Sequence, residues 1–549
     1  MAFHQIDRIL RRLHHLGTIG ELLGVLAVSS MTGCGGSPAN APLQIRITPA
    51  AATIGPGEST TLVASCVDVT GSSLPCPPVA WSLTEGSLTA VDGSDTVRRF
   101  TASAHPGVYV ARASSGTAGT LAAMTVTNGS ETANLTIQPA ERFQTLRGWE
   151  AAVSAGWRVS PAAFEELAHR AANEIGLTRM RMEVTGNQVE TRTDLRGTCG
   201  NTRRVLGVND NADPALQDPA GFNWYCLDEK VRTYVLPFKR AVEARGERFV
   251  LNACYVGFMP SSAFQQEDPA EYAELVVATL NHLKTTFGLV PDLWETRLEP
   301  DNDQFHIDGR QLGRLVAAAG ARAAAAGYTG LRFSLPSTKV ADNALPYFTE
   351  AMRVPGAAQF VGEIVYHRYR APSSGTLAAL AEAARSHGLE TAMLEYFNAT
   401  EHDLWADLTQ ANVSSWEKYA LAGPVYSASR GNQLYYADRA NDRFLLRPAT
   451  YPLLQYFRFL RPGFIRVGTR GSASGVEPVA FITPTGGIVL VVNLPGRTPL
   501  HVAGLPPGTY QVTYSSPAAP GASGLPITLG VGGILSTSLP EDGTVTIAQ

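Results

Sequence analysis

The 549-residue chain carries few charged side chains, and the two signs nearly cancel. Charged residues make up 17% of the sequence, below the roughly 25% of an average globular protein. Its 44 lysines and arginines stand against 48 aspartates and glutamates, a net charge of −4. Proteins that wrap nucleic acid need a basic excess, so this balance argues against a nucleic-acid partner. Outside the N-terminus no apolar run reaches about 18 residues, which argues against a polytopic membrane protein.

Several motifs that would announce a cofactor or a nucleophile are also missing. No CxxC or HxxxH pattern supports a zinc site. No GxGxxG or P-loop turn follows a predicted strand, which disfavours a doubly wound nucleotide-binding sheet. No GxSxG elbow is present, which disfavours a serine hydrolase.

The N-terminus has the features of an export signal. Arg8, Arg11 and Arg12 precede a mostly apolar stretch at 22–28, which leads to small residues and then to Cys34. The segment Met31-Thr32-Gly33-Cys34 resembles the acylation site of a bacterial lipoprotein, and a plain signal peptide or an N-terminal anchor is the alternative. We predict a lipoprotein signal at 1–34 and a flexible tether at 35–42, with Cys34 as the lipidation site. The mature protein would then be exported and lipid-anchored to the bacterial cell envelope, at the outer membrane or the cell surface. This anchor would be its only contact with the membrane.

The five remaining cysteines fit an exported protein. Cys66 and Cys76 lie ten residues apart in a β-like segment, and Cys199 and Cys226 bracket a polar stretch. Cys254 lies within an apolar run. We expect two local disulfides, Cys66–Cys76 and Cys199–Cys226, and one buried free thiol at Cys254.

Both ends of the chain are rich in short alternating strands. Residues 43–127 show strands separated by turn residues every 8–12 positions, a pattern typical of a β-sandwich, and resemble the bacterial Ig-like domains. This domain could bind carbohydrate or a partner, but a stalk is the preferred interpretation. Residues 128–142 are predicted as a linker and a strand, in which ANLTIQP joins a second β-sandwich at 443–549.

The middle of the chain, 143–442, alternates apolar extended runs with Ala-rich helical patterns. Such strand–helix units predict a parallel sheet with crossover helices. We count eight strands, which predicts a (β/α)₈ TIM barrel with its active site at the carboxyl ends of the strands.

Two glutamates stand out at those ends. Glu299 closes the fourth predicted strand and Glu395 the seventh, so the two face each other across the barrel mouth. Paired carboxylates of this kind carry out glycoside hydrolysis, in which one donates a proton and the other attacks the sugar. Glu295 and Glu183 are the alternative carboxylates.

The chain resembles the clan A glycoside hydrolases, most of all family 30, which includes glucosylceramidases, endoxylanases and β-1,6-glucanases. The likeness spans 143–549 and rests on short segments in the family's order, namely QTLRGW at 144–149, Glu299-Pro300, Tyr366-His367-Arg368-Tyr369, Leu394-Glu395-Tyr396, RPGFIRV at 461–467 and VVN at 491–493. The resemblance implies a retaining enzyme for β-linked glycans, with Glu299 as acid/base, Glu395 as nucleophile, and no metal or organic cofactor. The two carboxyl groups should then lie about 5–5.5 Å apart.

The sequence departs from the family before the acid/base glutamate. The family usually has an asparagine there, which touches the sugar 2-OH, whereas this chain has Leu298. The substrate could lack a free 2-OH, the site could be degenerate, or Asn302 or Asn252 could reach the hydroxyl.

Further side chains are candidates for substrate binding. Arg179 or Arg181 could hold the nucleophile ionised, and we expect only one of them, Arg181, to face inward. His367 could orient the acid or bind a hydroxyl, or be a structural residue, and it lies two residues before Tyr369. Each candidate aromatic near a strand end could stack on a sugar or lie in the core; these are Trp149, Tyr255 and Trp416.

The leading hypothesis is therefore a cell-surface glycosidase that acts as a monomer on an oligo- or polysaccharide. The alternative is a non-catalytic glycan-binding or adhesive lipoprotein on a degenerate barrel. Sugar, linkage and endo or exo action are left open.

Overall fold

The structure is a computed structural model that describes residues 44–549, apart from 56–57, 69–71, 84–86, 92, 103–106, 117, 127–131, 154–159, 198, 200–204, 259–266, 303–305, 424–432, 472, 497 and 517–518. The chain divides into two compact units, Met1–Glu131 and Thr132–Gln549. The predicted signal with Cys34, and the tether after it, lie outside the described residues. Among the helices that are described, none has both the length and the apolar character to cross a membrane.

The first unit consists of short strands in two sheets. They are β1 (Gln44–Thr48), β2 (Ala51–Ile54), β3 (Ser59–Val67), β4 (Ser73–Leu74), β5 (Ala80–Leu83), β6 (Ser87–Ala90), β7 (Val97–Thr101), β8 (Gly107–Ser115) and β9 (Ala118–Val126). One sheet has the order β1-β3-β7-β6 with β4 beside β3, and the other has the order β2-β9-β8-β5. Burial alternates along β1, where Ile45 and Ile47 point inward. Leu62 and Met124, from different sheets, share one apolar core, and Cys66 is joined to Cys76.

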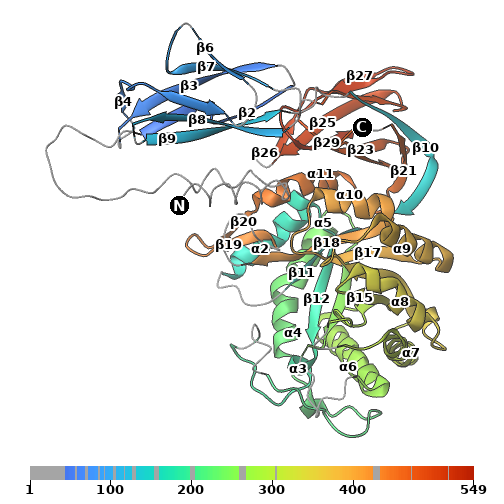
Figure 1. Cartoon of the computed structure of the whole chain (residues 1–549). Coiled ribbons are helices and arrows are strands. Elements are labelled where there is room, and N and C mark those ends of the chain that lie inside the picture. Colours follow the sequence, from blue (N-terminus) through green and yellow to red (C-terminus); the bar gives the residue numbers. More distant parts are fainter. Residues whose placement is uncertain are drawn as a thin grey trace, which may run out of the picture. The chain divides into compact units, whose positions relative to one another are not determined.

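Eight parallel strands close into a barrel in the second unit (Figure 1). They are β11 (Gly148–Val153), β12 (Arg179–Thr185), β13 (Val250–Val256), β14 (Leu293–Glu295), β15 (Arg332–Thr338), β16 (Val361–His367), β17 (Glu390–Glu395) and β18 (Val413–Gly423). Each strand pairs with the next along the chain, and β18 returns to pair in parallel with β11. The eight strands and the (β/α)₈ fold predicted from the sequence are confirmed.

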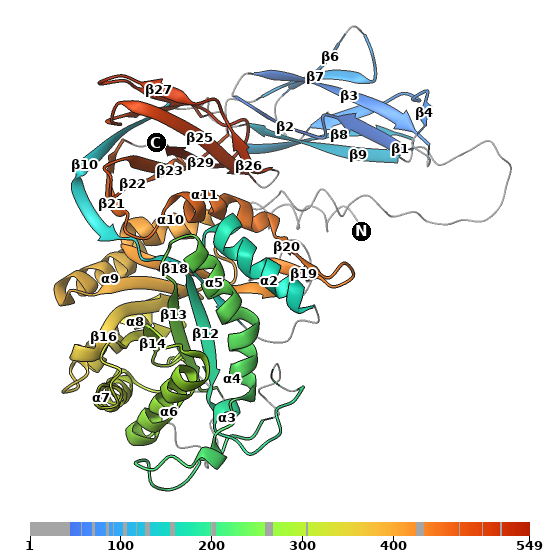
Figure 2. The same cartoon turned by 180° about the vertical axis from the view of Figure 1, so that it is seen from behind.

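Helices surround this barrel, as the two opposite views of Figures 1 and 2 show. They are α2 (Pro161–Arg170), α3 (Gly186–Val189), α4 (Tyr225–Lys230), α5 (Leu236–Ala244), α6 (Pro269–Phe287), α7 (Gly309–Ala325), α8 (Ala341–Met352), α9 (Ser374–His387) and α10 (Glu401–Gln410). Local signals set their ends. In α6 the Asp268 side chain accepts hydrogen bonds from two N–H groups of the first turn, and Gly288 ends the helix in the left-handed conformation at φ 66°.

The barrel sheet extends past the boundary expected at residue 442. Strand β19 (Gln433–Asp438) pairs in parallel with β18, and β20 (Arg443–Leu446) returns antiparallel to β19. Helix α11 (Tyr451–Phe459) then leads to the C-terminal β domain.

The C-terminal β domain is a ten-stranded sheet with a core of its own. Its strands are β10 (Ala133–Thr145), β21 (Ile465–Arg470), β22 (Glu477–Ile482), β23 (Ile488–Leu494), β24 (Leu500–Ala503), β25 (Gly508–Ser516), β26 (Ala519–Ser523), β27 (Ile527–Leu529), β28 (Leu535–Thr537) and β29 (Gly543–Ala548). The strand before the barrel, β10, pairs with β21 and β24, so both ends of the second unit meet in this sheet. Helix α11 joins it to the barrel, since the Tyr456 hydroxyl donates to Asn493 Oδ1 at 2.9 Å.

Candidate active site

The backbone that carries Glu299 to the barrel mouth has an unusual conformation. Strand β14 ends at Glu295, earlier than the sequence suggests, and the chain then stays hydrogen-bonded to its neighbours. The Leu298 N–H donates to the Tyr255 carbonyl at 2.9 Å, and the Glu299 N–H donates to the Ser337 carbonyl at 3.0 Å. Glu299 has a φ of 46° and Ser337 one of 58°. Non-glycine residues rarely adopt this conformation, and where they do the surrounding structure must hold them there.

Glu299, Glu395 and His367 converge at this mouth. Glu395 is the last residue of β17, and His367 is the last residue of β16. Carboxylate oxygens of the two glutamates and a ring nitrogen of His367 all lie within 4.8 Å of one another, and all three residues are buried. At least one oxygen of each carboxyl group therefore lies nearer to the other glutamate than the roughly 6.5–9.5 Å that separates the carboxyl groups of inverting glycosidases.

Two side chains fix the position of Glu395. Arg181 Nη1 donates to Glu395 Oε2 at 2.9 Å, and the Tyr369 hydroxyl donates to Glu395 Oε1. Burial, and then the neighbouring Glu395 carboxylate, raise the pKa of Tyr369, so the phenol keeps its proton for this hydrogen bond.

Glu299 is held by His367 and Asn302. His367 Nδ1 lies 3.4 Å from Glu299 Oε1, and Asn302 Nδ2 donates to Glu299 Oε2 at 3.0 Å. Burial acts to raise the pKa of Glu299, but the hydrogen bond and charge of His367, together with the Asn302 bond, outweigh it and lower the pKa. In the free protein Glu299 is therefore held toward its ionised form.

A chain of polar contacts connects the two glutamates below the mouth. His367 Nε2 lies 3.1 Å from Ser337 Oγ, and this hydroxyl donates to Glu295 Oε1. Arg181 Nε and Nη2 bind both oxygens of Glu295 at 2.7 Å, while Nη1 reaches Glu395. Burial acts to raise the pKa of Glu295, but the Arg181 charge outweighs it and lowers the pKa. Ser337 was not predicted from the sequence, and Glu295 was predicted only as an alternative catalytic carboxylate.

A fourth carboxylate, Glu417, lies against the same guanidinium. Arg181 Nη1 is 3.3 Å from Glu417 Oε1, and both side chains are at most 1% exposed. Burial raises the pKa of Glu417 well above its usual value, and Arg181 offsets this only in part. Glu417 is therefore held toward its neutral form, and Arg181 makes its shorter bonds to Glu295 and Glu395.

The expectation that only one of Arg179 and Arg181 faces inward is wrong. Residues two apart in a strand point to the same face, so both lie inside the barrel. Arg179 binds Glu150 at 2.9 Å and Glu363 at 2.8 Å in a layer below Arg181. The barrel interior is thus built from charged pairs at positions that apolar side chains fill in many barrels.

Three aromatic candidates for sugar binding lie in the core instead. Trp149 is fully buried, and its Nε1 donates to the Leu460 carbonyl at 2.8 Å. Trp416 is equally buried and donates to Asp407 Oδ2 at 2.9 Å, and Tyr255 packs edge-on against Tyr272 of α6. Trp149 and Trp416 each stand next to an inward-facing glutamate in their strands, so all three aromatic side chains take outward positions and face helices rather than the mouth.

The remaining candidates occupy different levels of the barrel. Asn252 is fully buried, pairs in register with Arg181 and lies beside Glu150, below the mouth. Leu298 is buried and offers no polar atom at the position where the family resemblance implies an amide. Glu183 accepts a hydrogen bond from Tyr419 at 3.4 Å.

Aromatic rings beside Glu395 were not all identified from the sequence. Tyr369 packs edge-on against Phe397, with ring centroids 5.2 Å apart, and Phe397 in turn lies 4.9 Å from Tyr419. Phe397 is 37% exposed, so it offers an accessible ring close to the glutamates. Its place two residues after a strand end was the available signal.

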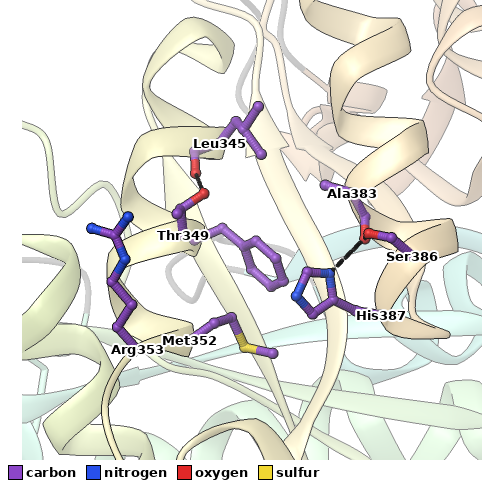
Figure 3. Close-up of a pocket in the computed structure, with 8 residues that line it drawn as sticks. Leu345, Thr349, Met352, Arg353, Ala383, Ser386 and His387 are labelled. Carbon is purple, nitrogen blue, oxygen red and sulfur yellow. Dashed lines mark hydrogen bonds between the residues drawn. The ribbon is translucent and has the colours of Figure 1, made fainter.

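A separate pocket of about 330 Å³ lies between α8 and α9 (Figure 3). It is lined by Leu345, Phe348, Thr349, Met352, Arg353, Ala383, Ser386 and His387. These residues come from α8, Arg353 just after it and the second half of α9, two helices that lead into the amino ends of β16 and β17. The pocket is therefore at the opposite end of the barrel from Glu299 and Glu395.

Comparison with solved structures identifies the fold. The catalytic domain of the GH30 xylanase C from Talaromyces cellulolyticus superposes with a TM-score of 0.58 at 16% identity, covering 76% of this chain and 99% of that chain. The glycoside hydrolase family 30 subfamily 8 xylanase from Clostridium acetobutylicum gives 0.56 at 17%, with 76% and 99% covered. An endo-β-1,6-glucanase gives 0.54 at 14%, with 77% and 96% covered.

The chain thus has the fold of these family 30 glycoside hydrolases, and identities of this size establish the fold alone. No protein-family model matches the chain, and no curated protein matches its sequence.

Proposed function

We propose that the protein is a retaining glycoside hydrolase that cleaves β-linked glycans, with Glu395 as the nucleophile and Glu299 as the acid/base. The main observation behind this proposal is that a carboxylate oxygen of Glu299 lies within 4.8 Å of one of Glu395 at the carboxyl-terminal face of the barrel. The structures with the same fold include two named xylanases and a named endo-β-1,6-glucanase, which supports a β-linked polysaccharide as the substrate.

In the first step a Glu395 oxygen attacks the anomeric carbon while Glu299 donates its proton to the departing glycosidic oxygen. The C–O bond to the leaving group breaks, and an ester bond between Glu395 and the sugar forms. In the second step Glu299, now ionised, takes a proton from water, and this water attacks the anomeric carbon and releases Glu395. Arg181 and Tyr369 hold Glu395 in place for attack.

Glu299 needs a proton before the first step, although its pKa is lowered in the free protein. A sugar that fills the mouth excludes water from Glu299, and the loss of solvation favours the protonated acid.

The experiment measures product configuration and the separate roles of the glutamates. Wild-type protein is tested on xylan, β-1,6-glucan and aryl β-glycosides, with the first-formed anomer followed by proton NMR. Retention of configuration is expected. Glu395→Gln should abolish turnover on every substrate, whereas Glu299→Ala should keep the first step on activated aryl glycosides and be rescued by azide.

Glu390→Gln is the matched control, because Glu390 begins the strand that Glu395 ends and pairs with Arg147 away from the mouth. It should retain wild-type activity. An inverted product would contradict the mechanism. Azide rescue of the Glu395 variant with retained configuration, rather than of the Glu299 variant, would mean that the roles are exchanged. Glycan binding without cleavage would favour the non-catalytic alternative.

We also propose that the mature chain is a monomer, exported and anchored in the cell envelope through an acylated Cys34. The basic, apolar and small-residue order of 1–34 and the Gly-Ser-Pro-rich tether after it support this location.

A further inference from the structure

A second group of buried carboxylates lies apart from Glu299 and Glu395. Oxygens of Asp210, Glu271 and Glu274 lie within 4.8 Å of one another. Asp210 comes from the long loop that follows β12 and α3, whereas Glu271 and Glu274 lie one turn apart on α6. Their side chains are 3%, 3% and 0% exposed.

These carboxylates have unused hydrogen-bonding capacity. Both oxygens of Glu274, Oε2 of Glu271 and Oδ1 of Asp210 are buried without any hydrogen-bond partner. Unpaired buried carboxylate oxygens are costly, and native structures normally satisfy them with a donor or a cation. The other oxygen of Asp210 is occupied, because it accepts from the Asp218 N–H at 2.7 Å and from Asn211 at 2.8 Å. The loop thus holds Asp210 with its free oxygen toward α6.

The surrounding charges do not neutralise the group. Arg322 Nη2 lies 3.7 Å from Glu274 Oε1, beyond hydrogen-bond distance, and its Nη1 donates to the Pro214 carbonyl instead. Asp213 and Asp268 add further negative potential, which acts on Glu274 and Glu271 respectively. One arginine therefore faces three carboxylates and two nearby aspartates.

The backbone is shaped to bring Asp210 close. A Cβ on Gly221 would lie 2.2 Å from the Asp210 Cβ, so only glycine allows the two segments to approach in this way. The disulfide Cys199–Cys226 joins the start of the same loop to α4. The cluster is thus a built feature of the fold rather than a chance meeting of surface acids.

We propose that Asp210, Glu271 and Glu274 bind a calcium ion. Oxygens this close together can lie about 2.3–2.6 Å from one central ion, which is the Ca–O distance. The donor set is entirely oxygen and suits hard cations rather than zinc or copper. Calcium accepts such protein-built cages, whereas magnesium keeps more of its water.

The ion would tie the loop after β12 to α6. Loops after barrel strands build the catalytic face, so calcium would stabilise one wall of that face without entering the chemistry. This proposal does not depend on the glycosidase assignment.

The test compares calcium binding and thermal stability in matched variants. Full-length protein is treated with EDTA, dialysed, and titrated with CaCl₂ and separately with MgCl₂ by calorimetry and differential scanning fluorimetry. We expect one calcium site with a Kd below about 1 mM, and a Tm rise of about 5 °C at 100-fold Kd. Magnesium should bind at least about tenfold more weakly.

Glu274→Gln should lose this calcium-dependent Tm rise while its Tm in EDTA equals or exceeds that of the wild type, because a buried charge is removed. Asp210→Asn is the second variant, used if the first does not fold. Glu166→Gln, an exposed glutamate on α2, is the control and should respond like the wild type. The proposal is overturned if 10 mM calcium gives neither heat nor a Tm change, if both variants keep the full calcium response, or if magnesium binds as tightly as calcium.

Discussion

Replacing Arg181 with methionine tests whether this guanidinium holds the barrel interior together. Arg181 makes two 2.7 Å bonds to Glu295 and one 2.9 Å bond to Glu395, and all three side chains are at most 7% exposed. Removing one partner of a buried ion pair costs about 3–5 kcal/mol, because the other charge is left uncompensated. For a domain of this size we expect a Tm decrease of roughly 6–10 °C at about 2 °C per kcal/mol.

The pH dependence gives this prediction its sharpest test. In the wild type the pKa of Glu295 is lowered, so its contribution to stability is present at neutral pH and is lost as pH falls through that pKa. In Arg181→Met the largest influence on Glu295, burial, would be opposed only by the Ser337 hydrogen bond and the His367 charge. We expect burial to raise the pKa of Glu295 above its unfolded value, so stability would be lost as pH rises. The deficit of the variant relative to the wild type should therefore be largest near pH 7 and shrink toward pH 4.

The assay is urea denaturation and scanning fluorimetry at both pH values. Adding Glu295→Leu to Arg181→Met should recover part of the stability, since it removes the stranded charge. Arg385→Met is the control, because Arg385 pairs with Glu382 on the surface, where such pairs contribute at most about 1 kcal/mol. A loss of under about 1 kcal/mol for Arg181→Met, or a deficit that does not change with pH, would refute the reasoning.

The remaining predictions address individual groups. Glu417→Gln should lower the free energy of unfolding by less than about 1 kcal/mol, because the raised pKa of Glu417 holds it toward its neutral form. In the same denaturation assay Glu295→Gln should lower the free energy of unfolding by about 3 kcal/mol, and equal losses would contradict the assigned charges. His367→Gln removes an interaction that lowers the pKa of Glu299, so the acid should stay protonated up to a higher pH. On a substrate with a poor leaving group, the alkaline limb of the kcat/KM profile should therefore move to higher pH, and an unchanged limb would exclude this role of His367. Cys34→Ala should shift the protein from the membrane to the soluble fraction, and continued pelleting without labelled fatty acid on the wild type would exclude acylation.

The periodicity of the sequence was sufficient to predict the barrel and the face of the barrel on which the two glutamates lie. Strand-like runs alternate with helical patterns in the expected number, and strand–helix repeats of this kind have few right-handed solutions. The position of Glu395 follows from its place at a strand end, because parallel strands in a barrel bring all carboxyl ends to one face. Glu299 reaches the same face from a segment that continues beyond the end of β14 at Glu295. These features depend on local pattern and connectivity, which the chain encodes segment by segment.

Which face of each strand points inward was decided only by the closed barrel. In β11 and β18 a tryptophan and a glutamate are adjacent, and either could have faced the interior. Closure placed Glu150 and Glu417 inside, against Arg179 and Arg181, and sent both tryptophans outward to the helices. The local sequence shows that side chains alternate between two faces, but it does not show which face points into the barrel. That choice depends on charge pairing among strands far apart in the chain.

The cluster of Asp210, Glu271 and Glu274 is a second feature that could not be predicted from the local sequence. Glu271 and Glu274 are visible in the sequence as two acids one turn apart, an ordinary arrangement on a solvated helix face. Asp210 lies some 60 residues earlier in an irregular loop, and the Gly221 contact brings it against them. Composition and periodicity predict the secondary structure of each segment separately. Whether distant carboxylates share one buried site depends on loop closure and burial, which arise only when the whole chain has folded.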